Sequence, residues 1–190
     1  MCLCVSKKSY VKTILKMFEN KVVRKTTATD EAAIFALYKK VAAEDGGIAR
    51  SEAEITEGYI HNFVAHSVSD GLGVVVEIDH QIVGELHAYP IGPKIFEHVL
   101  SNLTIAVHPD FQGQGIGKQL FTYFLNIVET EMPHILRVEL DTRDGNERAI
   151  ALYQNVGFLI EGRLRNRDKL EDGRFFDDLA MGWLNKNYGK

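Results

Sequence analysis

Residues 107–118 read VHPDFQGQGIGK, and they carry the clearest structural signal in the chain. A run rich in β-branched side chains, LTIAV at residues 103–107, leads into this stretch, and apolar residues at helical spacing follow it. The pattern predicts a strand, a loop with three glycines and the start of a helix. Glycines leave backbone N–H groups open to an anion, and a helix N-terminus adds about half a positive charge. The stretch therefore favours a phosphate-binding loop.

The spacing of the glycines excludes two common phosphate loops. A Walker A loop would require glycine at position 112 and a hydroxyl side chain at position 119, but glutamine stands at both. A dinucleotide-binding fingerprint would require G-x-G-x-x-G after the first strand, whereas this loop reads G-x-G-x-G and lies past the middle of the chain. The pattern that fits is Gln112-x-x-Gly115-x-Gly117, which resembles the acetyl-CoA pyrophosphate loop of the GNAT acetyltransferases.

A second motif further along the chain supports the same resemblance. It reads N-x-x-A-x-x-x-Y-x-x-x-G-F, from Asn146 through Tyr153 to Phe158. Asn146 and Tyr153 are about two helical turns apart, so both project from one face of a helix. Gly157 suits a left-handed helix C-cap. In the GNAT family this helix carries an Asn and a Tyr towards CoA; the plainer alternative is a tight turn at the glycines and a core aromatic at Tyr153.

Composition sets the class of protein. The chain has 190 residues, a hydrophobic fraction of 45% and a charged fraction of 25%, which predicts one globular domain. Its net charge of −4 argues against bulk affinity for nucleic acid. We find neither a signal peptide nor an apolar run of the roughly 18 residues that a membrane span requires. The only cysteines, Cys2 and Cys4, suit neither a disulfide nor a metal site, which favours a reducing cytoplasm.

The chain divides into an N-terminal extension, residues 1–20, and one domain, residues 21–190. Apolar residues of the extension fall at helical spacing among lysines: Val11, Ile14, Leu15 and Phe18. One interpretation is an amphipathic helix that docks on a membrane surface or a partner. The other is a short helix packed on its own domain, or a disordered tail.

The domain reads as an α/β protein with a mixed sheet. We expect strands at residues 22–25, 72–78, 82–89, 102–108 and 136–141, and a final hairpin of 158–170 and 175–183 across the turn at 171–173. We expect helices after a capping box at Thr27 and Asp30, at 54–66, at 118–131 and at 147–155. The first helix should bury Ala33, Leu37, Tyr38 and Val41. The resemblance implies the GNAT fold, a mixed central sheet splayed around acetyl-CoA and flanked by helices.

The resemblance, which covers residues 22–184, also implies the residues that hold acetyl-CoA. Backbone groups of the strand before the loop would pair with the pantetheine arm, and loop N–H groups would bind the pyrophosphate. Asn146 would contact the pantetheine or cap its own helix, and Lys118 would add a charge or remain a solvated helix lysine. The complete set of expected cofactor contacts is Ile105, Ala106, Val107, Gln112, Gly113, Gln114, Gly115, Ile116, Gly117, Lys118, Asn146 and Tyr153.

Acetyl transfer to an amine requires a proton acceptor for the amine and a donor for the CoA thiolate. Tyr153 is the expected donor, unless it only packs beside the cofactor. Many relatives place a Glu near the start of the strand before the loop, where Asn102 stands here, and Asn102 cannot accept a proton. Glu85 is the first choice and Glu139 the second, with His87 and His108 as water relays; deprotonation through ordered water alone is the alternative. Glu85 could equally be an outward-facing strand carboxylate.

These expectations together predict an acetyl-CoA-dependent N-acetyltransferase without a metal, acting by direct transfer in a ternary complex, and a homodimer by analogy with relatives. The alternative is a non-catalytic CoA sensor or scaffold. The connection between the first two helices is acidic, and it contains Glu44, Asp45, Glu52, Glu54 and Glu57. These side chains could bind a cationic amine, or they could belong to an ordinary solvated loop. The hairpin around 161–166, with Asp177 and Asp178, resembles relatives that acetylate ribosomal protein N-termini, polyamines or small amino compounds.

Overall fold

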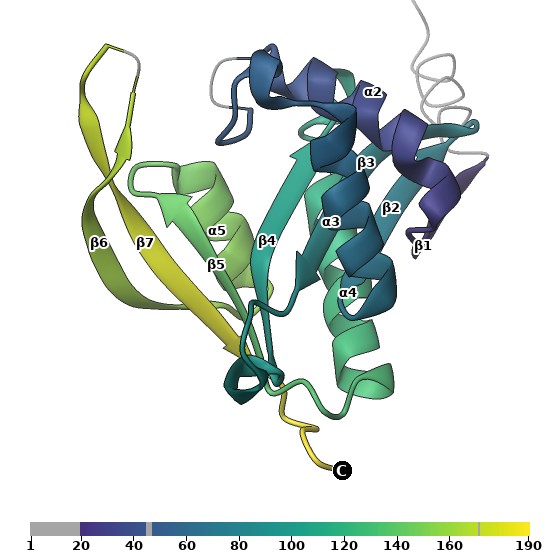
Figure 1. Cartoon of the computed structure of the whole chain (residues 1–190), viewed down its shortest axis with the longest axis vertical. Coiled ribbons are helices and arrows are strands. Elements are labelled where there is room, and N and C mark those ends of the chain that lie inside the picture. Colours follow the sequence, from purple (N-terminus) through teal and green to yellow (C-terminus); the bar gives the residue numbers. More distant parts are fainter. Residues whose placement is uncertain (1–19, 45–46, 171) are drawn as a thin grey trace, which may run out of the picture.

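A seven-stranded sheet forms the centre of the protein in a computed structural model that describes residues 20–44, 47–170 and 172–190. The strands are β1 Lys21–Lys25, β2 Leu72–Ile78, β3 Gln81–Tyr89, β4 Val99–Val107, β5 Arg137–Arg143, β6 Leu159–Lys169 and β7 Phe175–Leu184. Their order in the sheet is β1-β2-β3-β4-β5-β7-β6 (Figure 1). Neighbouring strands run antiparallel except β4 and β5, which run parallel. The predicted mixed sheet is confirmed.

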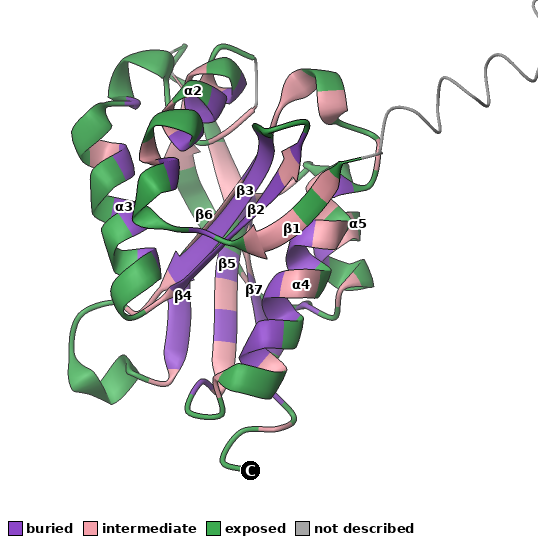
Figure 2. Cartoon of the chain, turned by 90° about the vertical axis from the view of Figure 1, so that its right-hand side faces the viewer, coloured by how far each residue is buried: buried purple, intermediate pink, exposed green. Residues whose placement is uncertain are grey.

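Helices cover both faces of this sheet. They are α2 Glu31–Ala42, α3 Glu57–Ser69, α4 Ile116–Glu131 and α5 Glu147–Asn155. Helices α2 and α3 bury their apolar faces against β2–β4 on one side, and α4 packs on the opposite side together with α5 (Figure 1). The purple stripes in Figure 2 show these buried faces turned towards the sheet between them. Two hydrophobic cores, one on each face, therefore fix the position of every helix.

Several predicted boundaries are corrected. Helix α4 begins at Ile116 rather than 118, and β4 begins at Val99 rather than 102. Helix α3 begins at Glu57, because Thr56 is its N-cap and accepts a hydrogen bond from the N–H of Tyr59 at 3.1 Å. The predicted burial of Ala33 is wrong: Ala33 is exposed, and Ile34 takes its place in the core.

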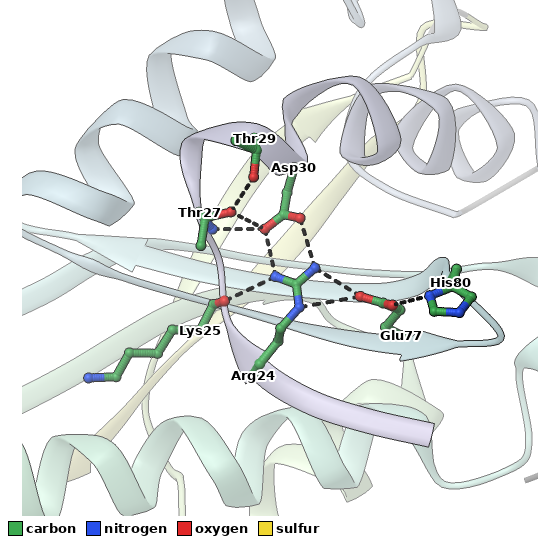
Figure 3. A network of polar contacts seen from close by, with 7 residues as sticks. All are labelled: Arg24, Lys25, Thr27, Thr29, Asp30, Glu77 and His80. Carbon is green, nitrogen blue, oxygen red and sulfur yellow. Dashed lines mark hydrogen bonds and ion pairs between the residues drawn. The ribbon is translucent and has the colours of Figure 1, made fainter. Parts of the chain in front are cut away.

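An ionic network ties β1, β2 and the start of α2 together (Figure 3). The Arg24 guanidinium donates to Asp30 Oδ2 at 2.7 Å and to Glu77 Oε2 at 2.9 Å. The N–H of Thr27 donates to Asp30 Oδ2 at 2.8 Å, which completes the predicted capping box. Burial alone would raise the pKa of Asp30, but the hydrogen bonds from Arg24 and Thr27 outweigh it and hold that pKa below its usual value. The network fixes the edge strand against its neighbour.

The sheet opens between β4 and β5. These strands pair at only two positions, Val99 with Arg137 and Leu100 with Val138. Immediately afterwards Asn102 adopts a left-handed backbone with φ of 52°, and the β3–β4 register shifts there. Such a bulge bends the strand that carries it. We call the divergence of β4 from β5 beyond Leu100 the splay, and it confirms the predicted shape of the sheet.

Some expectations fall outside the described residues. These are Cys2, Cys4 and nearly all of the predicted extension, together with Asp45 of the acidic connection and residue 171 of the hairpin turn. Among the helices that the structure describes, none has both the length and the apolar character needed to cross a membrane.

Candidate active site

The glycine loop joins β4 to α4 at the edge of the splay. Gly113 and Gly115 have φ of 74° and 79°, left-handed values that favour glycine, and Gly115 is the N-cap of α4. Gly117 serves a different purpose, because a Cβ there would lie 3.1 Å from Leu152 of α5. The first two glycines turn the chain, and the third lets α4 and α5 pack closely.

The loop presents a row of unpaired donors. The backbone N–H groups of residues 113–118 donate no hydrogen bond to any residue that the structure describes. A helix leaves its first N–H groups unpaired, and the left-handed turn adds those of the loop to the same row. A row of donors at a helix N-terminus is suited to an anion such as a pyrophosphate.

The two predicted glutamines brace this loop with their side chains. Gln112 Nε2 donates to the carbonyl of Val107 at 3.2 Å, and Gln114 Nε2 donates to the carbonyl of Asp110 at 3.0 Å. The guanidinium of Arg148, on α5, donates to Gln112 Oε1 at 3.1 Å. Side chains therefore hold the loop in shape and leave the backbone N–H groups of residues 113–118 unpaired among the described residues.

Two cations stand at the loop. Lys118, in the first turn of α4, is exposed and forms no ion pair with the described residues. Arg148 is also exposed, and its bond to Gln112 places it beside the glycines. Sequence reasoning missed Arg148; the signal was its place in the first turn of the second motif's helix, two residues after Asn146.

Tyr153 projects from α5 into the core beneath the splay. Its side chain is 8% exposed, and its ring lies edge-on to Phe121 with centroids 5.3 Å apart. Burial raises the pKa of Tyr153 to about 12, so the phenol keeps its proton at neutral pH. Its hydroxyl makes no hydrogen bond within the described part of the chain. Packing against Phe121 and Phe158 therefore fixes the ring.

The other predicted cofactor contacts divide between backbone and side chain. Asn146 Oδ1 accepts from the N–H of Ala149 at 3.2 Å, so Asn146 is the N-cap of α5, and its amide NH₂ group is unpaired among the described residues. Ile105, Ala106 and Val107 pair with β3 on one side only. Their other backbone edge faces the splay, where β5 no longer pairs with β4.

The predicted proton acceptor Glu85 lies away from this edge. Its side chain is 0% exposed, on the face of β3 that α2 and α3 cover. The Tyr38 hydroxyl donates to Glu85 Oε2 at 2.6 Å, and His87 Nδ1 lies 3.1 Å from the same oxygen. The ring of Phe63 stacks on His87 with centroids 3.9 Å apart. The structure thus places Glu85 in a closed polar cluster, and His87 with it.

Strand β5 brings two other carboxylates to the splay. Glu139 accepts from Ser101 Oγ at 2.6 Å and from Arg137 Nε at 2.7 Å, so it bridges β4 and β5 where they part. Asp141 follows on the same strand face and is exposed, with Arg167 at 3.7 Å. Burial, then the charges of Glu139 and Asp168, raise the pKa of Asp141. Sequence reasoning missed Asp141, although alternation along β5 would have placed it beside Glu139.

The remaining predicted residues are peripheral. Glu52, Glu54 and Glu57 are exposed in the α2–α3 connection, which lies at the same end of the sheet as the glycine loop (Figure 1). His108 Nδ1 accepts from the N–H of Asp110 at 3.3 Å, at the start of that loop. Within the described residues, no group of three or more His, Cys, Asp or Glu side chains is arranged to hold a metal ion.

Several known proteins are similar to this chain in sequence or fold. The [Ribosomal protein bS18]-alanine N-acetyltransferase of Escherichia coli K12 is 33% identical over 91 residues, 48% of this chain. The chain spans 60% of the length of that curated relative. The crystal structure of a ribosomal-protein-alanine N-acetyltransferase from Brucella melitensis has a TM-score of 0.74 and 25% identity, over 86% of this chain and 99% of that one.

A phosphinothricin acetyltransferase from Sinorhizobium meliloti, solved in complex with acetyl-CoA, shares the fold with a TM-score of 0.75 at 19% identity, over 87% of this chain and 89% of that one. The sequence model of the acetyltransferase (GNAT) family matches residues 26–158, which include the splay, the glycine loop and α5. This chain therefore belongs to the acetyltransferase (GNAT) family.

Proposed function

We propose that this protein transfers the acetyl group of acetyl-CoA directly to a primary amine. The observation that carries the proposal is the row of unpaired N–H groups at residues 113–118. Helix α5, which packs on this turn through Leu152, carries the buried Tyr153, whose hydroxyl is unpaired among the described residues. The names of the relatives support it, since the Escherichia coli and Brucella melitensis proteins are N-acetyltransferases and the Sinorhizobium meliloti protein was solved with acetyl-CoA.

Acetyl-CoA binds along the open edge of β4 in this proposal. The pantetheine arm pairs with backbone groups of Ile105, Ala106 and Val107, where β5 has moved away. The pyrophosphate lies on the unpaired N–H groups of residues 113–118, and Arg148 and Lys118 add positive charge beside it. The unpaired amide of Asn146 is in place for a further contact with the cofactor.

The reaction exchanges a C–S bond for a C–N bond. The amine nitrogen attacks the thioester carbonyl, and a β4 backbone N–H stabilises the negative charge that builds on its oxygen. The C–S bond then breaks, and Tyr153 gives its proton to the departing thiolate. The raised pKa of Tyr153 ensures that the proton is present at neutral pH. Solvent returns a proton to the phenol afterwards.

The amine proton needs an acceptor at the splay. Glu85, the acceptor that the sequence predicts, has no exposed surface, so it could act only through Tyr38 or His87. Glu139 is held by Ser101 and Arg137. Asp141 is the better placed carboxylate, because it is exposed and its raised pKa brings it closer to the pH of the reaction. We therefore place the acceptor at Asp141 and keep Glu85 and Glu139 as the variants to compare with it.

The acceptor is a small amino compound, a polyamine or a protein N-terminus in this proposal, and the protein acts in the cytoplasm. The homodimer stays a prediction. Release of free CoA thiol from acetyl-CoA, measured over a panel of primary amines with product identification by mass spectrometry, tests the activity. Acetyl-CoA binding without transfer to any amine would favour the alternative, a CoA sensor that does not turn over.

A further inference from the structure

The face of the sheet that α4 and α5 do not cover continues past the splay onto β5, β7 and β6. On β7, Leu179, Met181 and Trp183 pack into the core on the α4 side. Alternation along a strand therefore turns Asp178 and Ala180 to the opposite face. No helix lies over this part of that face (Figure 1).

The aspartates on this face outnumber the arginines that pair with them. Arg143 Nη2 lies 3.2 Å from Asp168 Oδ2, and Arg167 Nη2 lies 3.7 Å from Asp141 Oδ2, so two arginines match two aspartates. Asp178 is the third aspartate, and its Oδ1 has no hydrogen-bond partner among the described residues. Asp178 is only 7% exposed, and its Oδ1 is shielded from solvent.

A shielded carboxylate without a donor is unfavourable. Removing a charged group from water has a large cost unless a counter-charge or hydrogen bonds replace the water. Burial, then the charges of Asp168 and Asp141, raise the pKa of Asp178 more than Arg167 and Arg143 lower it. A cation from outside the chain would therefore stabilise the Asp178 carboxylate.

Asp178 lies close to Asp141, the carboxylate at which we place the proton acceptor. Its Cα pairs with Arg143 of β5, and Asp141 pairs with Ala180, so Asp141 and Asp178 are diagonal neighbours on adjacent strands. Diagonal neighbours of this kind are roughly 7–8 Å apart. A short alkyl chain with a nitrogen at each end can therefore reach both carboxylates at once.

We propose that Asp178 binds a second positive charge on the acceptor, so that the preferred substrates carry an ammonium group a few carbon atoms from the reacting amine. The proposal rests on the acetyltransferase function proposed above and names the substrate class for that site. The same chemistry occurs in a free diamine and in a peptide N-terminus that is followed by lysine.

The test measures kcat/KM with the full chain for acetyl-CoA and a series of diaminoalkanes, each against the alkylamine of equal length. We expect at least a tenfold preference for short diamines, declining as the chain lengthens. Peptides with lysine or norleucine at their second position form the other arm, and a preference there but not among diamines identifies the protein N-terminus as the source. Equal rates in both arms overturn the proposal.

Asp178→Asn tests the residue itself. The variant should lose the diamine preference by at least tenfold, retain its monoamine rate and unfold at a higher temperature, because an unpaired buried charge is removed. Asp172→Asn, in the hairpin turn, is the matched control and should keep the preference. A preference that survives in Asp178→Asn overturns the assignment. If the wild type neither binds acetyl-CoA nor acetylates any amine, the proposed function itself fails, whereas transfer without charge preference removes only this inference.

Discussion

The hydroxyl of Tyr38 donates a hydrogen bond to Oε2 of Glu85 at 2.6 Å, and neither side chain has any exposed surface. Tyr38 belongs to α2 and Glu85 to β3, so this bond ties the helical layer to the sheet. Burial, then the negative charge of Glu85, raises the pKa of Tyr38 well above its usual value, and the phenol remains a proton donor over the whole physiological range. The bond compensates a carboxylate that has no access to water.

Tyr38→Phe should therefore destabilise the fold. Glu85 would lose its shortest hydrogen bond and keep only the contact with His87. Leaving a buried acceptor without its donor lowers the free energy of unfolding by about 1–3 kcal/mol. Urea unfolding measures the change, with Tyr123→Phe on α4 as the control that should change little. Equal unfolding curves for Tyr38→Phe and wild type would show that the bond contributes nothing to stability.

Variants of three carboxylates should identify the proton acceptor. Asp141→Asn should lower kcat/KM near neutral pH and remove the acidic limb of its pH profile, because Asp141 lies exposed on β5 at the splay. Glu85→Gln should lower stability and leave the position of that limb unchanged. Glu139→Gln completes the comparison. If only Glu85→Gln lost the acidic limb of the pH profile, Glu85 would be the proton acceptor through a relay. If no variant lost it, the amine would lose its proton to ordered water.

The sequence predicted the local features of the site better than its long-range ones. The glycine loop, α4, α5 and Tyr153 follow from spacing within short segments, and the structure places them together. The role of Glu85 stays a prediction, but its burial was not foreseen, because strand alternation gives two faces and does not say which one the helices cover. The start of β4 was missed for a related reason: the left-handed Asn102 interrupts the alternation that marks a strand.

The missed residues depend on contacts between distant segments. Arg148 gains its place beside the glycine loop only when α5 packs on α4 through Gly117 and Leu152. Asp141 becomes a candidate only when β5 separates from β4. The sequence pattern of a single segment indicates neither the packing of α5 on α4 nor the separation of β5 from β4. The family resemblance predicted the splay, but it did not identify Arg148 or Asp141.

The glycine loop gives the most direct test of cofactor binding. Gly115→Glu would place a carboxylate on a left-handed backbone at the row of unpaired N–H groups. The negative charge should weaken acetyl-CoA binding at least tenfold, which corresponds to about 1.4 kcal/mol. Calorimetry measures the affinity, and circular dichroism checks the fold. Gly58→Glu, in the first turn of α3, adds the same side chain elsewhere and should leave the affinity unchanged. Equal affinity in Gly115→Glu would remove the loop from the binding site.

If Arg148 binds the phosphates of CoA, its removal should raise the KM only of acetyl donors that carry phosphate. Arg148→Met keeps much of the side chain's apolar stem but removes the charge and the bond to Gln112. The KM for acetyl-CoA should rise at least fivefold. The KM for S-acetylpantetheine, which has no phosphate, should stay the same, and this second substrate is the internal control. An equal rise for both would mean that Arg148 acts through the shape of the loop rather than through its charge.

Tyr153→Phe separates a catalytic phenol from one that only packs. The ring and its contact with Phe121 are kept, so acetyl-CoA affinity should not change. Loss of a general acid should lower kcat by roughly 10²-fold. Steady-state kinetics and calorimetry on one preparation give both numbers. A kcat within about twofold of wild type would assign Tyr153 to packing alone.

Tyr153→Phe should also change how the free energy of unfolding depends on pH in alkaline solution. Burial raises the pKa of Tyr153 from 10.0 to about 12, so the folded state holds this proton more tightly than the unfolded state. The resulting stabilisation, roughly 3 kcal/mol, is fully present below pH 10 and is lost as the pH rises towards 12. Wild type should therefore lose more free energy of unfolding than Tyr153→Phe between pH 10 and pH 12. Parallel losses would mean that the phenol is open to solvent, which would also undermine the claim that it holds its proton for the departing thiolate.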